Sequence, residues 1–239
     1  MDPCFDWCVP DFYTEWSYDD YWSDLDAEFD GYYDSGETNE FSYIDADGLN
    51  YVVTDWDGDG IFAGYPEFES YWQNYQGYEN SCAIEAQRSV IESVLEQHID
   101  HLDLADFAER SGWYDPDGGT PVEHMGRLLE HFEIPHSFHN NTSITDLVEA
   151  LESGQRVIVP INCNETRTPL YDGYGDPVQQ ETAGHAIVVT GIVEDQGKIC
   201  VVVNDSAYEN SGAGMTIPIE HFLNAWEDYN RTAIITNLA

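Results

Sequence analysis

The chemistry most readily read from this 239-residue sequence belongs to a cysteine at the start of a predicted helix. The polar stretch from Gln76 to Ser81 runs directly into Cys82, and apolar residues of helical spacing begin at Ile84. Unsatisfied N–H groups at a helix N-terminus lower the pKa of a thiol, to roughly 3.5–7.5 when a protonated histidine is also close. A single cysteine in this position is usually a small buried apolar residue, so its neighbours decide between the two interpretations.

Two polar side chains are suited to assist a thiolate at Cys82. Gln76 precedes the cysteine by six residues, so its amide can fold back beside the sulfur and donate a hydrogen bond to a developing oxyanion. His185 begins an apolar run that extends to Val193, and its imidazole is the predicted general base. A glutamine, a cysteine and a histidine in this order predict acyl transfer by a thiolate nucleophile.

A third group must hold the imidazole in the correct tautomer and orientation. The runs 185–193 and 198–203 are predicted to be two strands joined by a hairpin turn at 194–197, so the start of one lies beside the end of the other. Asn204 and Asp205 both follow the second run. Because successive residues of a strand point to opposite faces, only one of them can serve. We expect Asp205, with Asn204 as the alternative.

The order of the predicted elements indicates an α+β domain. From Cys82 to Gly154 the apolar spacing is helical: the first helix turns Glu92 outward, and Thr120 and Thr145 are predicted to cap later helices. Beyond Gly154 the chain is dense in β-branched residues, which predicts an antiparallel sheet on which the helices pack.

The first 69 residues differ in composition from the rest. Residues 1–80 hold 21 of the 47 acidic residues, 22 of the 33 aromatic residues and none of the seven basic ones. So many aromatic side chains argue against a disordered acidic tail, and Asp/Gly turns recur between short strand-like runs at 41–65. We expect an N-terminal segment at 1–69, acting as a lid, a pro-segment or a calcium module, followed by a catalytic domain at 70–239.

One stretch of the N-terminal segment carries the first half of a calcium loop. Asp55, Asp57 and Asp59 alternate along the chain, so their carboxylates could converge on one hard cation. The closing bidentate glutamate is missing, because Pro66 stands at position twelve and Glu67 comes one residue later. Weak calcium binding is therefore predicted, with a solvated hairpin turn as the alternative. No cofactor is predicted for catalysis.

The balance of charge bears on the class of partner. The chain has 47 acidic and 7 basic residues, a formal net charge of −40. A field of this sign repels nucleic-acid phosphates and anionic lipid, which argues against direct nucleic-acid or membrane binding. High-salt adaptation, an acidic interaction or metal-binding segment and polyanion mimicry would each explain it. No signal peptide or membrane-spanning run is seen, so we expect a cytoplasmic or non-classically exported form.

Three motifs together resemble the papain-like cysteine peptidase superfamily. They are Gln-x-x-x-x-Ser-Cys at 76–82, Gly-His-Ala-Ile-Val-Val-Thr-Gly at 184–191 and Val-Asn-Asp-Ser at 203–206. The closer similarity, over about residues 70–236, is to the bacterial double-glycine, or bacteriocin-leader-processing-like, peptidases and their stand-alone relatives. The sequence departs from that branch at Ala83, where glycine is common, at Ser206, which replaces the proline of an Asp-Pro pair, and in having no following transporter segments.

The resemblance implies a papain-like α+β fold, in which a helical N-terminal subdomain carries the cysteine at a helix start and packs on a C-terminal antiparallel sheet. It implies Cys82 as the nucleophile, Gln76 as the oxyanion-hole amide, His185 as the general base and Asp205 as the orienting acid. The expected function is thiol-dependent hydrolysis of amides in peptide or protein substrates. The alternative is a catalytically idle papain-like binding protein, or an acidic polyanion mimic, that engages a basic partner.

Overall fold

The structure is a computed structural model that describes residues 39–44, 50–55, 60–78, 80–175 and 177–237, with side chains described from residue 60 onward. Its helices and strands are, in chain order, β1 (Asn39–Ile44), β2 (Asn50–Asp55), β3 (Ile61–Gly64), α2 (Pro66–Ser70), α3 (Cys82–Leu95), α4 (His101–Arg110), the 3₁₀ helix η1 (Val122–His124), α5 (Arg127–His131), β4 (His136–His139), α6 (Ile144–Glu152), β5 (Val157–Asn162), α7 (Cys163–Arg167), β6 (Gly184–Asp195), β7 (Lys198–Asn204), β8 (Met215–Pro218), α8 (Ile219–Glu227) and β9 (Ala233–Thr236).

Most of the described strands form one antiparallel sheet. It has seven strands within the described residues, in the order β4-β9-β5-β6-β7-β8, with β3 paired to β6 outside that path. Strands β6 and β7 pair out to Asp195↔Lys198, and the two residues between them, Gln196 and Gly197, have φ angles of 50° and 77°. A two-residue turn with both φ angles positive matches the twist of paired strands. The predicted hairpin is confirmed.

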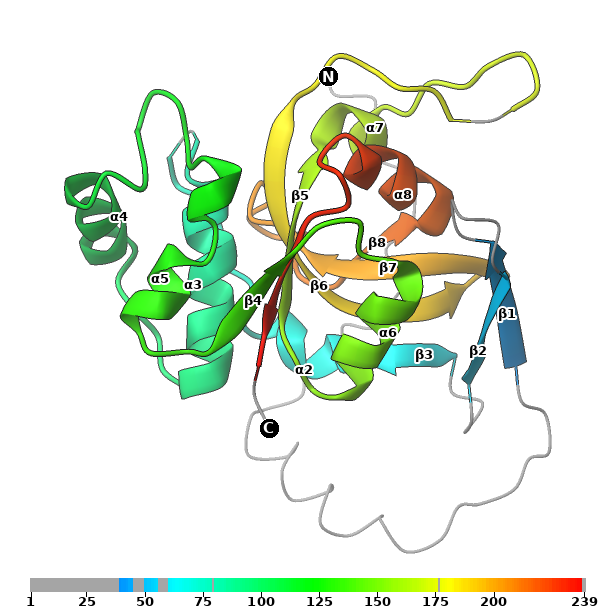
Figure 1. Ribbon diagram of the computed structural model, residues 1–239, viewed down its shortest axis with the longest axis horizontal. Helices are drawn as coiled ribbons and strands as arrows, with labels where there is room; N and C mark the ends of the chain where they lie inside the picture. Colours follow the sequence, from blue (N-terminus) through cyan, green and yellow to red (C-terminus); the bar gives the residue numbers. More distant parts are fainter. Residues whose placement is uncertain (1–38, 45–49, 56–59, 79, 176, 238–239) are drawn as a thin grey trace, which may run out of the picture.

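Helices cover both faces of the sheet, and strand periodicity explains how (Figure 1). Neighbouring residues of β6 point to opposite faces. Ile187 packs in the core that includes Trp226 of α8 and the buried residues of α6. Val188 packs in a second core with Ile91 of α3 and Leu128 of α5. In Figure 1, α3, α4 and α5 lie together on one side as a helical subdomain. The predicted α+β arrangement of helices against an antiparallel sheet is confirmed.

The outer face of α3 is more deeply buried than its sequence predicts. Glu92, expected to face solvent, is 0% exposed, as is Glu85 two turns earlier. Arg88 pairs with both carboxylates, at 3.1 Å from Glu85 and 3.0 Å from Glu92, and the Ile99 amide donates to Glu92 at 2.7 Å. The chain that follows the helix folds back over this face. Side chains that would be solvated on an isolated helix therefore become buried ion pairs.

The caps predicted at Thr120 and Thr145 are wrong. The long helix expected after Thr120 is divided at Gly126, whose φ of 113° is incompatible with a helix. Gln87 of α3 supplies the missing cap, because its Oε1 accepts the amide of Gly126 at 2.7 Å. Helix α6 is capped by Ser143 in a reciprocal capping box. A buried glutamine from a distant helix thus outcompetes the local capping signal.

Part of the predicted N-terminal segment belongs to the main sheet. Strands β1 and β2 form a separate antiparallel pair, whereas β3 pairs with β6. The division at residues 69 and 70 stays a prediction. Asp57, Asp59 and the side chain of Asp55 lie outside the described residues, so the calcium site also stays a prediction. Within the described parts of the chain, no three or more His, Cys, Asp or Glu side chains are grouped to hold a metal ion.

The described helices are short or polar. None of them combines the length and the apolar character required to cross a membrane. The longest helix, α3, has 14 residues and carries the two buried glutamates described above.

Candidate active site

Cys82 is the first residue of α3, and the helix N-terminus in front of it is not capped by a side chain. The N-cap residue, Ser81, makes no cap hydrogen bond. Its buried hydroxyl donates instead to the Tyr78 carbonyl at 2.9 Å. A capping oxygen would occupy amides of the first helical turn. The Ile84 amide donates to the Ser81 carbonyl at 2.9 Å, and the Ala83 amide interacts with the Cys82 sulfur, so an amide of the first turn serves the thiolate in place of a side-chain cap.

His185 contacts Cys82 on one side and Asp205 on the other. Its side chain hydrogen-bonds to the Cys82 thiol, and its Nε2 lies 2.6 Å from Asp205 Oδ1. With Nε2 engaged by the carboxylate, Nδ1 is the nitrogen left to face the sulfur. His185 is 7% exposed and Asp205 is 3% exposed. The structure therefore brings the predicted nucleophile, base and acid together, with the base and the acid buried and the thiol half-buried.

Paired strands position the histidine and the carboxylate. His185 is the second residue of β6, and Asp205 directly follows β7, the partner of β6. The other candidate acid, Asn204, is used elsewhere: its Nδ2 donates to the Glu69 carbonyl at 2.7 Å, and its Oδ1 accepts the Gly214 amide at 3.2 Å. Of the two residues that the sequence left open, Asp205 is the one in contact with His185.

The electrostatics favour a thiolate beside an imidazolium. Burial by itself would raise the pKa of Cys82, but the hydrogen bond and charge of His185, with the backbone amides of Ala186 and Ala83, lower that pKa below its ordinary value of 9.0. Burial would lower the pKa of His185, but the hydrogen bonds and negative charges of Asp205 and Cys82 raise that pKa from 6.5 to about 10. Each partner thus stabilises the charged form of the other.

Asp205 is held in its ionised form by several donors. Burial would raise its pKa, but the hydrogen bond and charge of His185, the Ala207 amide and the charge of Arg167 lower the pKa below 3.8. The Ala207 N–H donates to Oδ1 at 2.8 Å, and Arg167 lies 3.8 Å from Oδ2. The Arg167 guanidinium also lies over the Tyr208 ring, 5.4 Å from its centroid. Sequence reasoning missed this arginine, which comes from α7.

Gln76 is fixed against the residue that follows Asp205. Its backbone amide donates to the Ser206 carbonyl at 2.8 Å, and its side-chain Oε1 accepts the Ser206 hydroxyl at 2.9 Å. Because the oxygen of the carboxamide is engaged, its nitrogen is the group left to donate. Gln76, the fourth predicted residue, is therefore held by the loop that carries Asp205.

A family model described as the Peptidase_C39-like family matches residues 65–234. The chain belongs to this family. The resemblance drawn from the three motifs is confirmed. A solved structure described as a C39-like peptidase from Bacillus anthracis is similar at 16% identity and a TM-score of 0.50, covering 75% of this chain and 98% of that chain. The α+β, papain-like fold predicted from the sequence is confirmed.

Two further solved structures are similar to this C39-like chain. One describes the mite allergens Blo t 1 and Der p 1, at 17% identity and a TM-score of 0.49, covering 70% of this chain and 66% of that chain. Another is procathepsin L 3 from the larval midgut of Tenebrio molitor, at 13% identity and a TM-score of 0.44, covering 71% and 64%. A comparison with curated proteins finds no match.

Two tyrosines that border the C39-like site were also missed. Burial raises the pKa of both Tyr114 and Tyr229, and nearby negative charges, that of Cys82 among them, raise it further. The Tyr229 hydroxyl lies 2.6 Å from the position that a Cβ on Gly184 would take. A side chain at position 184 would therefore require the Tyr229 hydroxyl to shift. Both tyrosines come from loops far from the three motifs, so no local pattern marks them.

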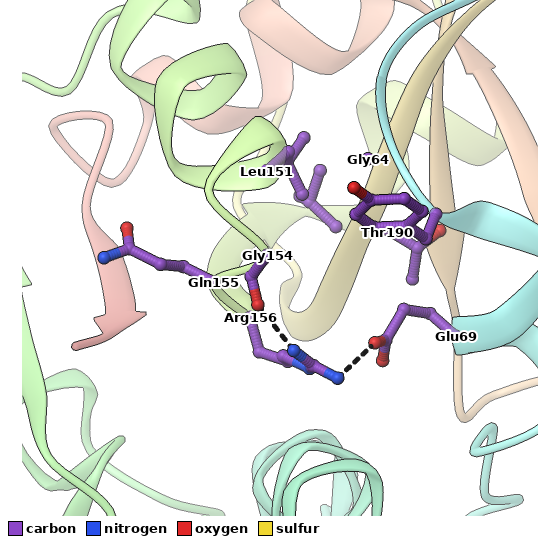
Figure 2. Close-up of a pocket in the computed structure, with 9 residues that line it drawn as sticks. Gly64, Glu69, Leu151, Gly154, Gln155, Arg156 and Thr190 are labelled. Atoms are coloured by element: carbon purple, nitrogen blue, oxygen red, sulfur yellow. Dashed lines mark hydrogen bonds and ion pairs between the residues drawn. The ribbon is translucent and has the colours of Figure 1, made fainter. Parts of the chain in front are cut away.

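A pocket elsewhere in the C39-like domain contains none of the four predicted residues. Figure 2 shows its centre, where Arg156 bridges the Glu69 carboxylate, at 3.0 Å, and the Gly154 carbonyl. Ser93 of α3 donates to the same carboxylate at 2.8 Å. These contacts join α2, α3 and the start of β5, so the pocket lies where these three elements meet.

Proposed function

We propose that this protein is a cysteine peptidase that hydrolyses amide bonds of peptide or protein substrates through an acyl-enzyme. The observation that carries the proposal is the contact of Cys82 with His185 and of His185 with Asp205, at the N-terminus of α3. A thiol against an imidazole, with a carboxylate fixing the far nitrogen, supplies a nucleophile, a base and an orienting acid. Membership of the Peptidase_C39-like family supports the same function.

In the first half of the reaction the Cys82 thiolate attacks the substrate carbonyl carbon. A C–S bond forms and the π electrons move to the oxygen. Gln76 Nε2 and the Cys82 backbone N–H donate to that oxyanion, which is stronger as an acceptor than the ground-state carbonyl. When the intermediate collapses, the C–N bond breaks and the His185 imidazolium protonates the departing amine. The products are a free amine and a thioester on Cys82.

Water completes the cycle. Neutral His185 takes a proton from a water molecule as that oxygen attacks the thioester carbon. The C–S bond then breaks, releasing the carboxylic acid and restoring the Cys82 thiolate beside protonated His185. Asp205 stays ionised throughout and holds the ring in one orientation. The low pKa of Asp205 suits this part, because an acid that took up the proton would weaken the base.

Alkylation by iodoacetamide followed by peptide mapping tests the nucleophile. At about pH 6 an ordinary thiol is almost fully protonated, so we expect Cys82 to react roughly 10- to 100-fold faster than a free thiol. Cys163→Ser is the matched control, since Cys163 is the other half-buried cysteine of the described residues. Its removal leaves the labelling rate at Cys82 unchanged. Both low-salt and molar-salt buffers are used, because salt screens repulsion within a −40 chain.

Hydrolysis of a peptide library tests turnover. His185→Ala is expected to reduce the rate by at least about 10³-fold, because the triad members act as a unit. Equal alkylation and cleavage rates in the wild type and His185→Ala would overturn the mechanism. A reactive Cys82 with no cleavage of any peptide, and binding to a basic partner that survives Cys82→Ser, would instead establish the idle binding protein.

A further inference from the structure

We infer that Ser206 is a positioning residue that holds the Gln76 carboxamide with its nitrogen toward the substrate oxyanion. The inference rests on the proposed function, because it assigns a task within the same acyl transfer. It concerns a residue outside the predicted set of Gln76, Cys82, His185 and Asp205. It also gives a physical reason for a serine at the position that follows the acid.

Ser206 makes two hydrogen bonds to Gln76. The Ser206 carbonyl accepts the Gln76 backbone amide at 2.8 Å, and the Ser206 hydroxyl donates to Gln76 Oε1 at 2.9 Å. The first bond fixes where the glutamine backbone lies. The second fixes which way the end of its side chain is turned.

The orientation of a carboxamide decides whether it stabilises or repels an oxyanion. Its oxygen only accepts and its nitrogen only donates. Turned by half a rotation, Gln76 would present Oε1 to the developing negative charge. The Ser206 hydroxyl favours the productive orientation, because it donates to Oε1 and leaves Nε2 pointing elsewhere. Ser206 is 5% exposed, so bulk water has little access to replace its hydroxyl.

The loop that carries Ser206 is held rigidly. Gln73 Nε2 donates to the carbonyls of Asp205 and Tyr208, both at 3.1 Å. The Asp205 amide donates to the Gly212 carbonyl at 2.8 Å. A Cβ on Gly212 would lie 1.9 Å from the Asp205 carbonyl oxygen, so only glycine permits this closure.

One rigid loop therefore positions both halves of the site. Asp205 orients the imidazole, and the next residue orients the oxyanion amide. A proline after the acid would offer the same carbonyl but no hydroxyl. Ser206 therefore adds a side-chain hydrogen bond that the Asp-Pro pattern lacks.

Two reactions of the full-length protein separate this task from general support of the site. Release of p-nitrophenol from p-nitrophenyl N-acetylglycinate measures acylation, which needs the oxyanion amide. Alkylation by iodoacetamide needs only the thiolate. Removing one oxyanion-hole donor costs about 10²–10³-fold, and a misoriented donor loses part of that. We expect Ser206→Ala to lower kcat/KM for the ester about 10-fold with the alkylation rate unchanged.

Three further variants complete the experiment. In a Gln76→Ala background, Ser206→Ala should cause no additional loss, because the amide it orients is gone. Ser206→Thr, which keeps the hydroxyl, should restore acylation. Ser93→Ala is the matched control, because Ser93 is also buried, at 3% exposed, and its hydroxyl donates to Glu69 in the pocket of Figure 2, which contains none of the four predicted residues. It should change neither rate.

Each outcome decides the question. Wild-type acylation in Ser206→Ala overturns the inference and leaves the proposed function standing. A parallel fall in acylation and alkylation also overturns it, since the loop would then support the whole site. A wild-type protein inert in both reactions overturns the proposed function itself. If Ser206→Ala does not fold, Ser206→Cys, with its weaker donor, must show a loss in acylation alone for the inference to hold.

Discussion

Two regions of this molecule contain a buried carboxylate paired with a cation, and they do different things. At the end of β7 Asp205 pairs with His185 at 2.6 Å. At the pocket of Figure 2 Glu69 pairs with Arg156 at 3.0 Å. Both residues are buried, at 3% exposed for Asp205 and 8% for Glu69. Burial and distance alone do not separate them.

The difference lies in the cation and in what it faces. His185 can release its proton and touches the Cys82 thiol, so its pair can move a proton during a reaction. Arg156 stays charged at any ordinary pH, and its other partners are the Ser93 hydroxyl and the Gly154 carbonyl. Burial raises the pKa of Glu69 in spite of Arg156 and Ser93, whereas the pKa of Asp205 is lowered. One pair is suited to chemistry and the other to joining segments.

The largest effect is expected from removing the Asp205 carboxylate, which follows β7. Asp205→Ala leaves the imidazole without an orienting partner, and we expect kcat/KM for the ester to fall about 10²–10⁴-fold. Asp205→Asn keeps a hydrogen-bond acceptor but not the charge, so its loss should be smaller. The charge of Asp205 helps hold the His185 pKa near 10, so the alkaline limb of the pH–rate profile should move to lower pH in Asp205→Asn.

The pH profile gives this prediction its control. The active form has an ionised Cys82 and a protonated His185, so the rate rises through the lowered Cys82 pKa and falls as His185 deprotonates near 10. Folding linkage has the matching sign. A histidine whose pKa is raised on folding adds stability that is complete below about pH 6.5 and lost as pH rises toward 10. An alkaline limb at the same pH in wild type and Asp205→Asn would contradict the assigned pairing.

The sequence predicted which residues meet in one region and did not predict the other pair. Cys82, His185 and Asp205 could be found because their types and order are informative, and strand pairing explained how the last two meet. Glu69 and Arg156 carry no such signal. Their pairing requires α2, α3 and β5 to meet, which depends on long-range packing.

The errors in the helices have the same cause. Glu92 was predicted to face solvent because helical spacing describes an isolated helix, and it is buried by the chain that follows. Thr120 carries a strong capping pattern, yet Gln87 from α3 caps α5. Helix spacing and capping patterns predict the structure correctly only where no segment distant in sequence supplies a competing contact. Tyr229 and Arg167 escaped notice for this reason too.

An intermediate effect, on stability alone, is expected at the Glu69 pair. Arg156→Met leaves a buried carboxylate without its cation, and breaking such a pair costs about 3 kcal/mol. We expect the urea midpoint to fall accordingly. The alkylation rate of Cys82 per folded molecule should not change, because the contacts of Arg156 are to Glu69, Ser93 and Gly154. Asn204, next to Asp205, reaches the backbone carbonyl of Glu69 and not the carboxylate that Arg156 holds.

A double variant tests whether the pair only joins segments. Replacing both partners with apolar residues removes the unpaired charge, so Glu69→Met with Arg156→Met should recover most of the lost stability. Alkylation of Cys82 slowed in the single variant, after correction for unfolded protein, would show that the two regions are coupled. That result would contradict the conclusion that the Glu69–Arg156 pair only joins segments and has no part in the reactivity of Cys82.

The smallest effect is expected from Arg167, which shares a feature with each pair. Like Arg156 it is a cation that stays charged, but its partner is the Asp205 carboxylate, at 3.8 Å, and its side chain is 36% exposed. Solvent screens such a contact, so Arg167→Gln should change kcat/KM at neutral pH by less than about threefold. Its loss removes one of the influences that lower the Asp205 pKa. A depressed carboxylate pKa adds stability that is lost as pH falls through it. On acid titration followed by circular dichroism, the variant should therefore unfold at a higher pH than wild type.

Arg127→Gln, whose partner Glu130 is exposed on α5, is the matched control and should leave the pH of acid unfolding in place. An unchanged pH of acid unfolding in Arg167→Gln would show that His185 and the Ala207 amide alone keep Asp205 ionised.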